Sequence, residues 1–445
     1  MNDWQTVTLE DVTESINTGL DAIRRAPIVE HRTNLRCLRI QDISQNKPFD
    51  KWGYTEVKDS DFKKFQLVPN DIIMARTCST GICYLVKKEL PAVFNNGLAR
   101  IRLKIEKVDP KFIYYVFKSK HFSGYIDGIS GGTSVQLNMK IGDLLKYQFN
   151  LPPLSEQKEI ARILSDLDKK IELNTQINQT LEQIAQALFK SWFVDFDPVR
   201  AKAQALSDGL SLEQAELTAM QAISGKTPEE LTALSQTQPD RYAELAETAK
   251  AFPCEMVEVD GVEVPMGWEC CTFGDVAECF DSKRIPLSKQ QREKRKGNIP
   301  YYGATSVMDY VNEAIFDDIY LLIGEDGSVL KEDGAPFTQY IWGKSWVNNH
   351  AHVIKGKNGV STEHLMLFIQ QTNITAYITG AVQLKLNQKN MNSIPFIKAS
   401  NKTNLIFAQY IEPLYAKIRK NFDENKILET TRDLLLPKLL NGEIE

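Results

Sequence analysis

The sequence has few of the residues that build metal sites and disulfide frameworks. Its 445 residues include seven cysteines and five histidines, and no Cys-x-x-Cys pair occurs. This pattern makes neither a zinc ribbon nor a disulfide-rich secreted domain, and a reducing cytoplasm fits it best. No apolar run reaches the roughly 18 residues that span a bilayer, and no charged-then-apolar leader is visible. We therefore expect a cytoplasmic protein without a membrane segment.

The motifs that commonly mark an active site are also missing. No Gly-x-Gly-x-x-Gly opens a βα unit, and no Asn-Pro-Pro-Tyr sequence typical of base methylation occurs. Gly225–Thr227 does not end a phosphate-binding loop, because Met220 stands where its first glycine belongs. His350 and His352 would share one face of a strand, but no cluster supplies further metal ligands. We therefore expect no catalytic residue, no metal and no cofactor on this chain. An enzyme with an unrecognised site remains an alternative.

The chain has ordinary globular composition, with 42% hydrophobic and 25% charged residues. Its length corresponds to two or three domains at roughly 100–200 residues each. The net charge of −5 argues weakly against nucleic-acid binding. However, residues 1–150 hold 22 Lys and Arg against 17 Asp and Glu, whereas residues 201–265 hold 4 against 12. Since binding depends on local patches, a positive surface outside the acidic segment is compatible with the total.

An internal repeat with a period of about 250 residues organises the chain. Asp71–Arg76 and Asp318–Ile323 are similar apolar strands, each leading to a turn with glycine. Further along, Val135–Asn138 matches Leu384–Asn387. The repeat predicts two related globules that share a scaffold and differ in their loops.

Each copy of the repeat ends in a long helix. Apolar residues at 4-3 spacing run from Ile160 to Trp192 and again, 247 positions later, from Phe407 to Leu439. This is the a/d seam of a coiled coil, although such a stripe is also typical of any helix that faces a core. Both seams carry two asparagines at equal positions, namely Asn174, Asn178, Asn421 and Asn425. Antiparallel pairing would let all four meet and set the register. A parallel pair would align them too, but the chain must return between two copies of one unit.

The predicted fold class is α+β, with two repeated α/β globules separated by two long helices that form an antiparallel coiled coil. The predicted parts are a first globule (1–150), a first long helix (151–198), an acidic connector (199–265), a second globule (266–397) and a second long helix (398–445). We expect the connector to be helical in places and broken at Pro228, Pro239 and Pro253. It is either a linker or a partner-binding segment.

Polar turns and one basic run are the candidate nucleic-acid contacts, because Arg, Lys, Asn, hydroxyl and carboxylate groups hydrogen-bond base edges and phosphates. Hairpin turns and a solvated loop are the alternative interpretations. In the first globule the candidates are Arg76, Thr77, Ser79, Thr80, Asn96 and Arg100. In the second they are Glu325, Asp326, Asn348, Asn349, His350 and His352. The basic run adds Lys283, Arg284, Lys289, Arg292, Lys294, Arg295 and Lys296.

With these features, the sequence resembles the specificity subunits of type I restriction-modification systems over nearly its whole length. The resemblance depends on the helix-opening segment Leu151–Ile160, the run Leu188–Pro198 that ends in Trp-Phe-Val-Asp-Phe-Asp-Pro, and the entry Val264–Trp268 into the second globule. Ile323–Ser328 and Asn348–His352 add to it. The second long helix departs from the pattern, because Ile394–Ile397 lacks the Pro-Pro-x-x-x-Glu-Gln opening.

The resemblance implies a non-catalytic DNA-recognition subunit with two target-recognition domains, each reading one half of a split sequence in double-stranded DNA. It implies that the helices separate the domains and dock two methyltransferase subunits, with Trp192 and Phe193 as candidate anchors. Restriction subunits that translocate DNA would join this core. S-adenosylmethionine, ATP and magnesium would bind those partners and not this chain. A coiled-coil scaffold or interaction protein of another defence system is the alternative.

Overall fold

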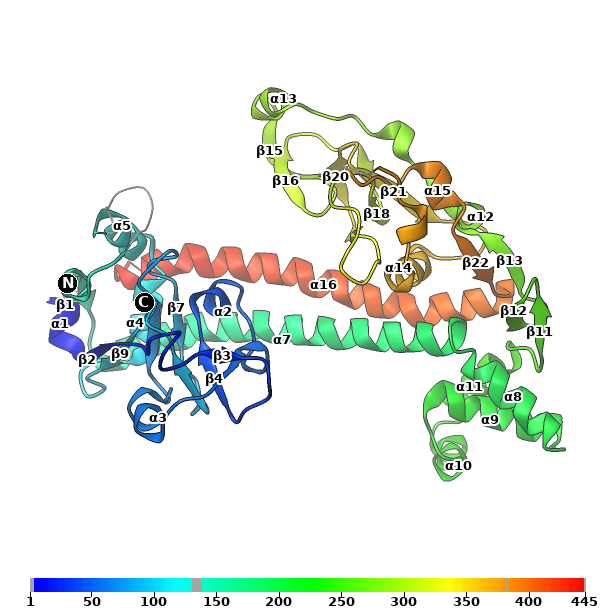
Figure 1. Cartoon of the computed structure of the whole chain (residues 1–445), viewed down its shortest axis with the longest axis horizontal. Helices are drawn as coiled ribbons and strands as arrows, with labels where there is room; N and C mark the ends of the chain where they lie inside the picture. The colour runs from blue at the N-terminus through cyan, green and yellow to red at the C-terminus, as the bar shows by residue number, and fades with distance from the viewer. Residues whose placement is uncertain (1–3, 130–137, 381–382, 444–445) are drawn as a thin grey trace. The chain divides into compact units, whose positions relative to one another are not determined.

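The computed structural model describes residues 4–129, 138–380 and 383–443. The described chain forms two compact units, one comprising residues 1–174 and 423–445 and the other residues 175–422. Each unit contains one α/β globule and a part of both long helices, as the colours in Figure 1 show. Among the described helices, none combines the length and the apolar character needed to cross a bilayer. Of the predicted repeat, Val135–Leu137 lies outside the described residues.

The first globule contains two four-stranded sheets. In sheet order the strands of one are β2 (Thr13–Thr18), β9 (Leu98–Leu103), β6 (Ile72–Ala75) and β7 (Cys83–Leu85), and those of the other are β3 (Ile28–Val29), β5 (Gly53–Thr55), β4 (Leu35–Leu38) and β8 (Ala92–Phe94). Strand β6 is buried on both faces, since successive side chains point to opposite sides. Ile73 and Ala75 pack into the core shared with the other sheet, whereas Ile72 and Met74 pack against a core that includes α4 (Pro110–Phe117).

The second globule repeats this arrangement. Its corresponding sheets contain β14 (Ala277–Cys279), β21 (Ala351–Gly356), β18 (Tyr320–Gly324) and β19 (Thr338–Ile341), and β16 (Val307–Val311), β15 (Lys296–Tyr302), β20 (Lys344–Val347) and β17 (Phe316–Asp317). Strand β18 alternates in the same way, with Leu321 and Ile323 in one core and Tyr320 and Leu322 in another. The predicted duplication is therefore confirmed in the facing of side chains and in the order of the first sheet, where β14-β21-β18-β19 repeats β2-β9-β6-β7. In the second sheet the parallel pair β15 and β20 repeats β4 and β8, but the edge strands differ, because β3 pairs with β5 whereas β17 pairs with β20.

Shorter elements complete both globules. The first has α1 (Leu9–Val12), α2 (Ile40–Ser44), α3 (Asp59–Phe65), α5 (Lys120–Ile129), α6 (Ile141–Leu144) and the strand pair β1 (Gln5–Thr8) with β10 (Gln148–Leu151). The second has α12 (Phe273–Val276), α13 (Lys289–Glu293), α14 (Thr362–Gln371), α15 (Gln388–Asn392) and the pair β13 (Glu269–Thr272) with β22 (Pro395–Lys398). Asp109 and Ser361 cap the equivalent helices α4 and α14, because their side chains accept hydrogen bonds from free backbone N–H groups.

The long helices α7 (Leu154–Phe193) and α16 (Asn401–Leu440) are 40 residues each. In the first unit, Asp168 pairs with Arg432 and Asn174 with Asn425. In the second unit, Asn178 pairs with Asn421, and the rings of Trp192 and Phe407 lie 5.6 Å apart. Within each unit, rising numbers on α7 meet falling numbers on α16. The predicted antiparallel pairing is therefore confirmed.

The connector is more regular than expected. It folds into α8 (Asp197–Ser207), α9 (Leu212–Ser224), α10 (Pro228–Thr237) and α11 (Pro239–Lys250), followed by the hairpin β11 (Met256–Val259) and β12 (Val262–Pro265). Pro228 and Pro239 begin helices instead of breaking them, because the first helical position needs no backbone N–H donor. Ala219, Met220 and Leu231 belong to a small core of this segment's own.

Candidate nucleic-acid interface

The same backbone hydrogen bonds hold the turn that follows β6 in the first globule and the turn that follows β18 in the second. The backbone N–H of Arg76 donates to the carbonyl of Gly97, and that of Glu325 donates to the carbonyl of His350. The carbonyls of Arg76 and Glu325 accept from Met139 and Leu386, which precede α6 and α15. Arg76 and Glu325 are therefore equivalent. At β6, the structural equivalence therefore differs by two residues from the sequence match. Ile72 corresponds to Leu321 and not to Ile319.

In the first globule this turn carries a mixture of donors and hydroxyl groups. Arg76 is half-buried and donates to the Thr18 hydroxyl at 3.1 Å. Thr77, Ser79 and Thr80 are half-buried on the turn itself, and Asn96 is exposed on the adjoining turn before β9. The structure thus brings all of these candidates to one edge of the sheet.

Arg100 does not belong to this surface. Its side chain is only 3% exposed and donates to the backbone carbonyls of Lys64 and Gln66 at 3.0 and 3.1 Å. The guanidinium group therefore fastens the end of α3 to the sheet and cannot reach a ligand. The sequence predicted an accessible Arg100 because the alternating pattern of a strand does not show which side chains another segment of the chain covers.

In the second globule the acidic turn is neutralised from within. Glu325 accepts from Arg284 at 2.8 Å and lies 3.3 Å from the Lys385 ammonium, while Asp326 pairs with His350. Arg284 also donates to the carbonyl of Ala351 and lies 3.2 Å from Asp281. Both carboxylates thus have side-chain partners within the globule and do not stand free to accept from bases, contrary to the expectation from the sequence.

Two further candidates in this globule are buried and support the turn from beneath. Asn348 accepts from the backbone N–H of His350 at 2.8 Å and is 3% exposed. His352 is 1% exposed, with Nδ1 2.5 Å from Asp281 and Nε2 2.7 Å from the carbonyl of Leu386. Asn349 is exposed and His350 is partly exposed. Of the four candidates from Asn348 to His352, only these two are therefore available at the surface.

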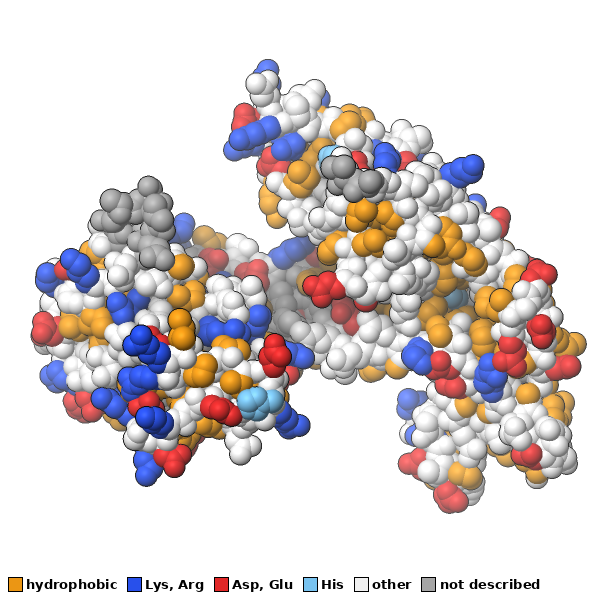
Figure 2. Space-filling model, viewed as in Figure 1, with side chains coloured by type: hydrophobic (Ala, Val, Ile, Leu, Met, Phe, Trp, Pro, Cys, Tyr) orange, Lys and Arg blue, Asp and Glu red, His pale blue; other side chains and the backbone are white. Residues whose placement is uncertain are grey.

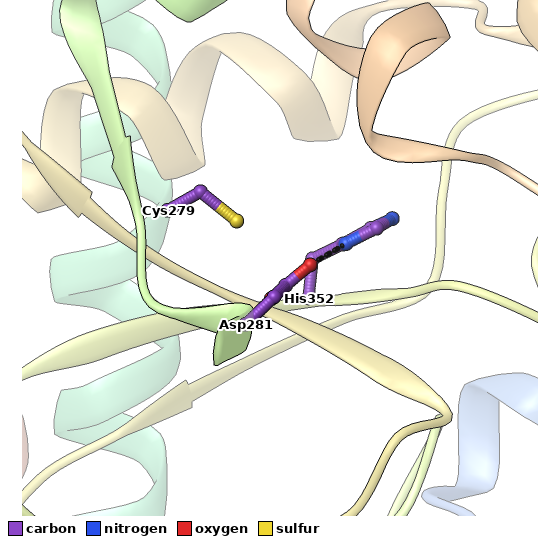
Figure 3. Close-up of side chains that lie close together, drawn as sticks. All are labelled: Cys279, Asp281 and His352. Atoms are coloured by element: carbon purple, nitrogen blue, oxygen red, sulfur yellow. Dashed lines mark hydrogen bonds and ion pairs between the residues drawn. The ribbon is translucent and has the colours of Figure 1, made fainter. Parts of the chain in front are cut away.

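Cys279, Asp281 and His352 lie close enough together to be considered as metal ligands, and Figure 3 shows their side chains converging. Both ring nitrogens of His352 already have oxygen partners within the chain, so neither is free to bind a metal ion. Burial raises the pKa of Asp281, but the hydrogen bond and charge of His352, the backbone N–H of Val353 and Arg284 together hold that pKa below its usual value. Burial raises the pKa of the Cys279 thiol to about 12. The trio fits a structural ion pair better than a metal centre.

The basic run lies between β14 and the start of β15 and includes α13. Figure 2 shows Lys and Arg side chains gathered at the α13 end of the second globule. Arg292 is held by Asp309 at 3.0 Å, and Arg295 by Glu313 at 2.9 Å. The cations that stand exposed are Lys283, Lys289, Lys294 and Lys296, together with the more weakly held Arg295. Arg284 and Arg292 serve instead to fix the loop.

The two candidate docking residues are inside the chain. Trp192 is fully buried, with its ring edge-to-face against Phe252 at 4.9 Å, and Phe193 packs against Trp268 and Phe407. The connector and the entry to the second globule fold over the end of α7 and cover both rings. Trp192 and Phe193 therefore stabilise this unit's core, and neither presents an exposed anchor to a partner.

The four seam asparagines meet in two pairs. In the first unit, Asn174 donates to Asn425 at 2.9 Å, and in the second, Asn421 donates to Asn178 at 2.8 Å. All four side chains are buried. Further bonds tie them to the helices, because Asn178 donates to the carbonyl of Ile418 and Asn174 donates to Glu424. The geometry matches the expected polar layer, while its effect on register stays a prediction.

Lys385 is a surface residue at the turn that was not among the sequence candidates. Its exposed position depends on a main-chain contact with Asp326, which the sequence does not show. The available signal was its place in a segment of the internal repeat, two residues before Asn387, which caps α15.

Known proteins place the chain in a family. The sequence model described as the type I restriction modification DNA specificity domain matches residues 1–183 and 265–429. The HindI specificity subunit of Haemophilus influenzae is 40% identical over 471 aligned positions, covering 100% of both chains. The MjaIX specificity subunit of Methanocaldococcus jannaschii is 24% identical, covering 83% of this chain and 76% of its own. The crystal structure of a type I S subunit from M. genitalium has the same fold, with a TM-score of 0.55, 17% identity and coverage of 98% and 96%. The chain therefore belongs to the family of type I restriction-modification DNA specificity subunits.

Proposed function

We propose that this chain is the non-catalytic recognition subunit of a type I restriction-modification complex and that its two globules each read one half of a split DNA target. The observation that carries this proposal is the duplicated turn. One backbone scaffold, fixed by the same hydrogen bonds, presents Arg76 and Thr77 in one copy and Glu325 and Asp326 in the other. Two copies of one scaffold with different side chains suit two readers of different sequences.

The long helices would separate the two readers and dock two methyltransferase subunits. Each unit leaves large apolar side chains of these helices in solvent, including Leu173 and Ile427 in the first and Ile184 and Leu405 in the second. Exposed apolar residues on a rigid helix pair are suited to protein docking. These residues replace Trp192 and Phe193 as the candidate contacts. S-adenosylmethionine would act on the methyltransferase subunits, and ATP and magnesium on the restriction subunits.

The test is to sequence methylated sites in DNA from cells that carry this chain with its modification subunits. The unchanged chain should give one split sequence. Arg76→Ala should relax bases in one half only, whereas His350→Ala should relax bases in the other half only. A lost base contact costs about 1–3 kcal/mol at one position. Altered bases in both halves from either variant would contradict two independent readers. No sequence preference at all would favour a scaffold without readout.

The spacer role has a separate test. Because α7 and α16 pair antiparallel in each unit, an insertion in one helix alone would displace its seam against the other. Four residues should therefore be inserted in both helices, after Thr175 and before Phe422. One added turn of about 6 Å corresponds to roughly two base pairs, so the half-sites should move apart without changing their bases. An unchanged spacing would contradict the spacer role.

A further inference from the structure

Three backbone segments meet at the reading turn of the second globule. The turn itself contributes Glu325 and Asp326, the segment before β21 contributes His350, and the segment before α15 contributes Lys385. Asp326 and Lys385 form a β-bridge, and Gly327 donates its backbone N–H to the carbonyl of Leu384. Main-chain hydrogen bonds of Glu325 and Gly327, the residues on either side of Asp326, thus fix Lys385 at the same edge as the turn.

The outer layer of this edge consists of donors. The side chains of Lys385 and His350 are 48% and 45% exposed, whereas those of Glu325 and Asp326 are 14% and 18% exposed. The Lys385 ammonium lies 3.3 Å from Glu325, and His350 contacts Asp326, so a less exposed carboxylate holds each of the two exposed side chains. An ammonium group has three donors, and its contact with Glu325 uses only part of them. The edge therefore presents N–H groups to a ligand that offers acceptors, which in the major groove is the N7 and O6 edge of guanine.

The equivalent position in the first globule carries a different readout group. Thr77 and Asn138 form the β-bridge that corresponds to Asp326 and Lys385, and Met139 donates to Arg76 as Leu386 donates to Glu325. Asn138 therefore corresponds to Lys385, and the sequence match of Asn138 with Asn387 was wrong by two residues. Asn138 is exposed. A carboxamide places a donor NH2 group beside an acceptor oxygen, which matches the N6 and N7 edge of adenine instead of guanine.

We propose that residues 138 and 385 are equivalent specificity-determining positions and that Lys385 reads a guanine in the half-site of the second globule. This inference rests on the proposed function, and it adds the chemistry of one base contact. Glu325 is then a positioning residue, since it holds the ammonium group and lies too deep to meet the base.

The experiment is methylated-site sequencing with Lys385→Asn in the full complex. One guanine in one half-site should lose its discrimination by about ten- to a hundredfold, while the other half-site stays unchanged. Asn138→Lys should alter one position in the opposite half. Lys355→Asn is the matched control, because Lys355 lies in the same sheet in an ion pair with Asp318 at the other end of β21, and its target should not change.

A second measurement changes the DNA and not the protein, so its first step uses the unchanged complex. Binding of the unchanged complex should weaken about tenfold or more when that guanine is replaced by 7-deazaguanine, which lacks the N7 acceptor. The Lys385→Asn complex should not respond to this replacement. Equal weakening on all sequences with a shallower salt dependence would mean a phosphate contact and would overturn the inference. If the unchanged complex modified no split sequence, the proposed function itself would fail. If it did so but Lys385→Asn kept the same target, only this inference would fail.

Discussion

The two globules of this subunit share the strand order of one four-stranded sheet and differ at the turn that follows its inner strand, β6 or β18. In the first, Arg76 reaches the Thr18 hydroxyl across the sheet edge. In the second, the equivalent residue is Glu325, which sits in a chain of charges with Arg284 and Lys385. The scaffold tolerates a reversal of charge at one position because the second copy supplies the balancing cations from other segments. The fold and the side-chain chemistry of this turn are therefore separable in this subunit.

The junctions with the long helices show the opposite contrast. In the first unit, the Tyr115 hydroxyl donates to Asp168 on α7 at 2.8 Å, and Arg432 of α16 contacts that carboxylate at 2.8 Å. In the second unit, Tyr340 of β19 donates at 2.6 Å to Glu363, which belongs to α14, and Arg419 of α16 lies beside both. Each junction uses a tyrosine, a carboxylate and an arginine, but the repeat supplies them from different elements. Chemistry has been kept here while positions have not.

The largest difference between the units is expected at the ends of the helices. Trp192 and Leu439 occupy equal seam positions, but only Trp192 is enclosed by connector aromatics. Trp192→Ala should cost about 3–5 kcal/mol of unfolding free energy in the second unit, more than Leu439→Ala costs in the first. Hydrogen exchange resolved by peptide gives the loss for each unit separately. Unchanged protection combined with weaker methyltransferase binding would show that Trp192 is a partner contact after all.

A pH dependence should distinguish the second unit from the first. His364 of α14 is buried among Phe193, Phe396 and Phe407, and burial lowers its pKa to about 3. Its counterpart in α4 is Phe112, three residues after the equivalent cap. Because the unfolded chain binds a proton near pH 6.5 and the folded one does not, stability is complete above 6.5 and falls between 6.5 and 3. The loss is about 2 kcal/mol at pH 5.

His364→Phe, which copies the first unit, should remove that loss. Denaturant unfolding of the two proteins at pH 8 and pH 5 measures the difference. An equal loss of unfolding free energy between pH 8 and pH 5 in both proteins would assign the acid sensitivity to other groups.

The asparagine pairs give smaller effects with opposite signs. Asn425→Leu alone should destabilise the first unit by about 1–3 kcal/mol, because the buried Asn174 amide then loses one of its two acceptors and keeps only Glu424. Replacing all four asparagines by Leu should instead raise stability, at the cost of a loosened register. Cysteines at Ile160 and Leu439, which belong to one core of the first unit, should crosslink efficiently in the unchanged seam and less selectively in the fourfold variant. Equal selectivity in both would remove the register role.

Much of this architecture follows from local patterns in the sequence. The seams of α7 and α16, the paired asparagines and the duplication all appear as spacings between residues, which a single chain displays directly. The repeat was misplaced by two residues at β6, where Ile72 corresponds to Leu321. A shift of two preserves which side chains face each core, so an alternating pattern cannot exclude it.

The candidate site was less predictable, because burial of a polar residue depends on distant segments. Arg100 and His352 have suitable chemistry for DNA, yet the end of α3 covers one and the segment before α15 covers the other. Trp192 resembles an exposed anchor until Phe252, sixty positions later, packs on it. Lys385 was missed for the converse reason, since its exposure arises from a main-chain contact with Asp326.

The smallest effect per residue should come from the basic run around α13, and it should differ in kind from every change at a turn. Lys294→Gln with Lys296→Gln removes two exposed cations, and each lost phosphate contact should lower the salt dependence of DNA binding by about 0.9 in log–log slope. Affinity should fall alike for all sequences, because phosphates carry no base information. Arg295→Gln is the graded control, since Glu313 already engages that side chain at 2.9 Å and it should contribute less. Titrations at several salt concentrations, with target and unrelated DNA, supply both quantities. If affinity fell only for the target sequence, the basic run would contact bases. Phosphate contacts and base contacts would then not be made by separate parts of the second globule.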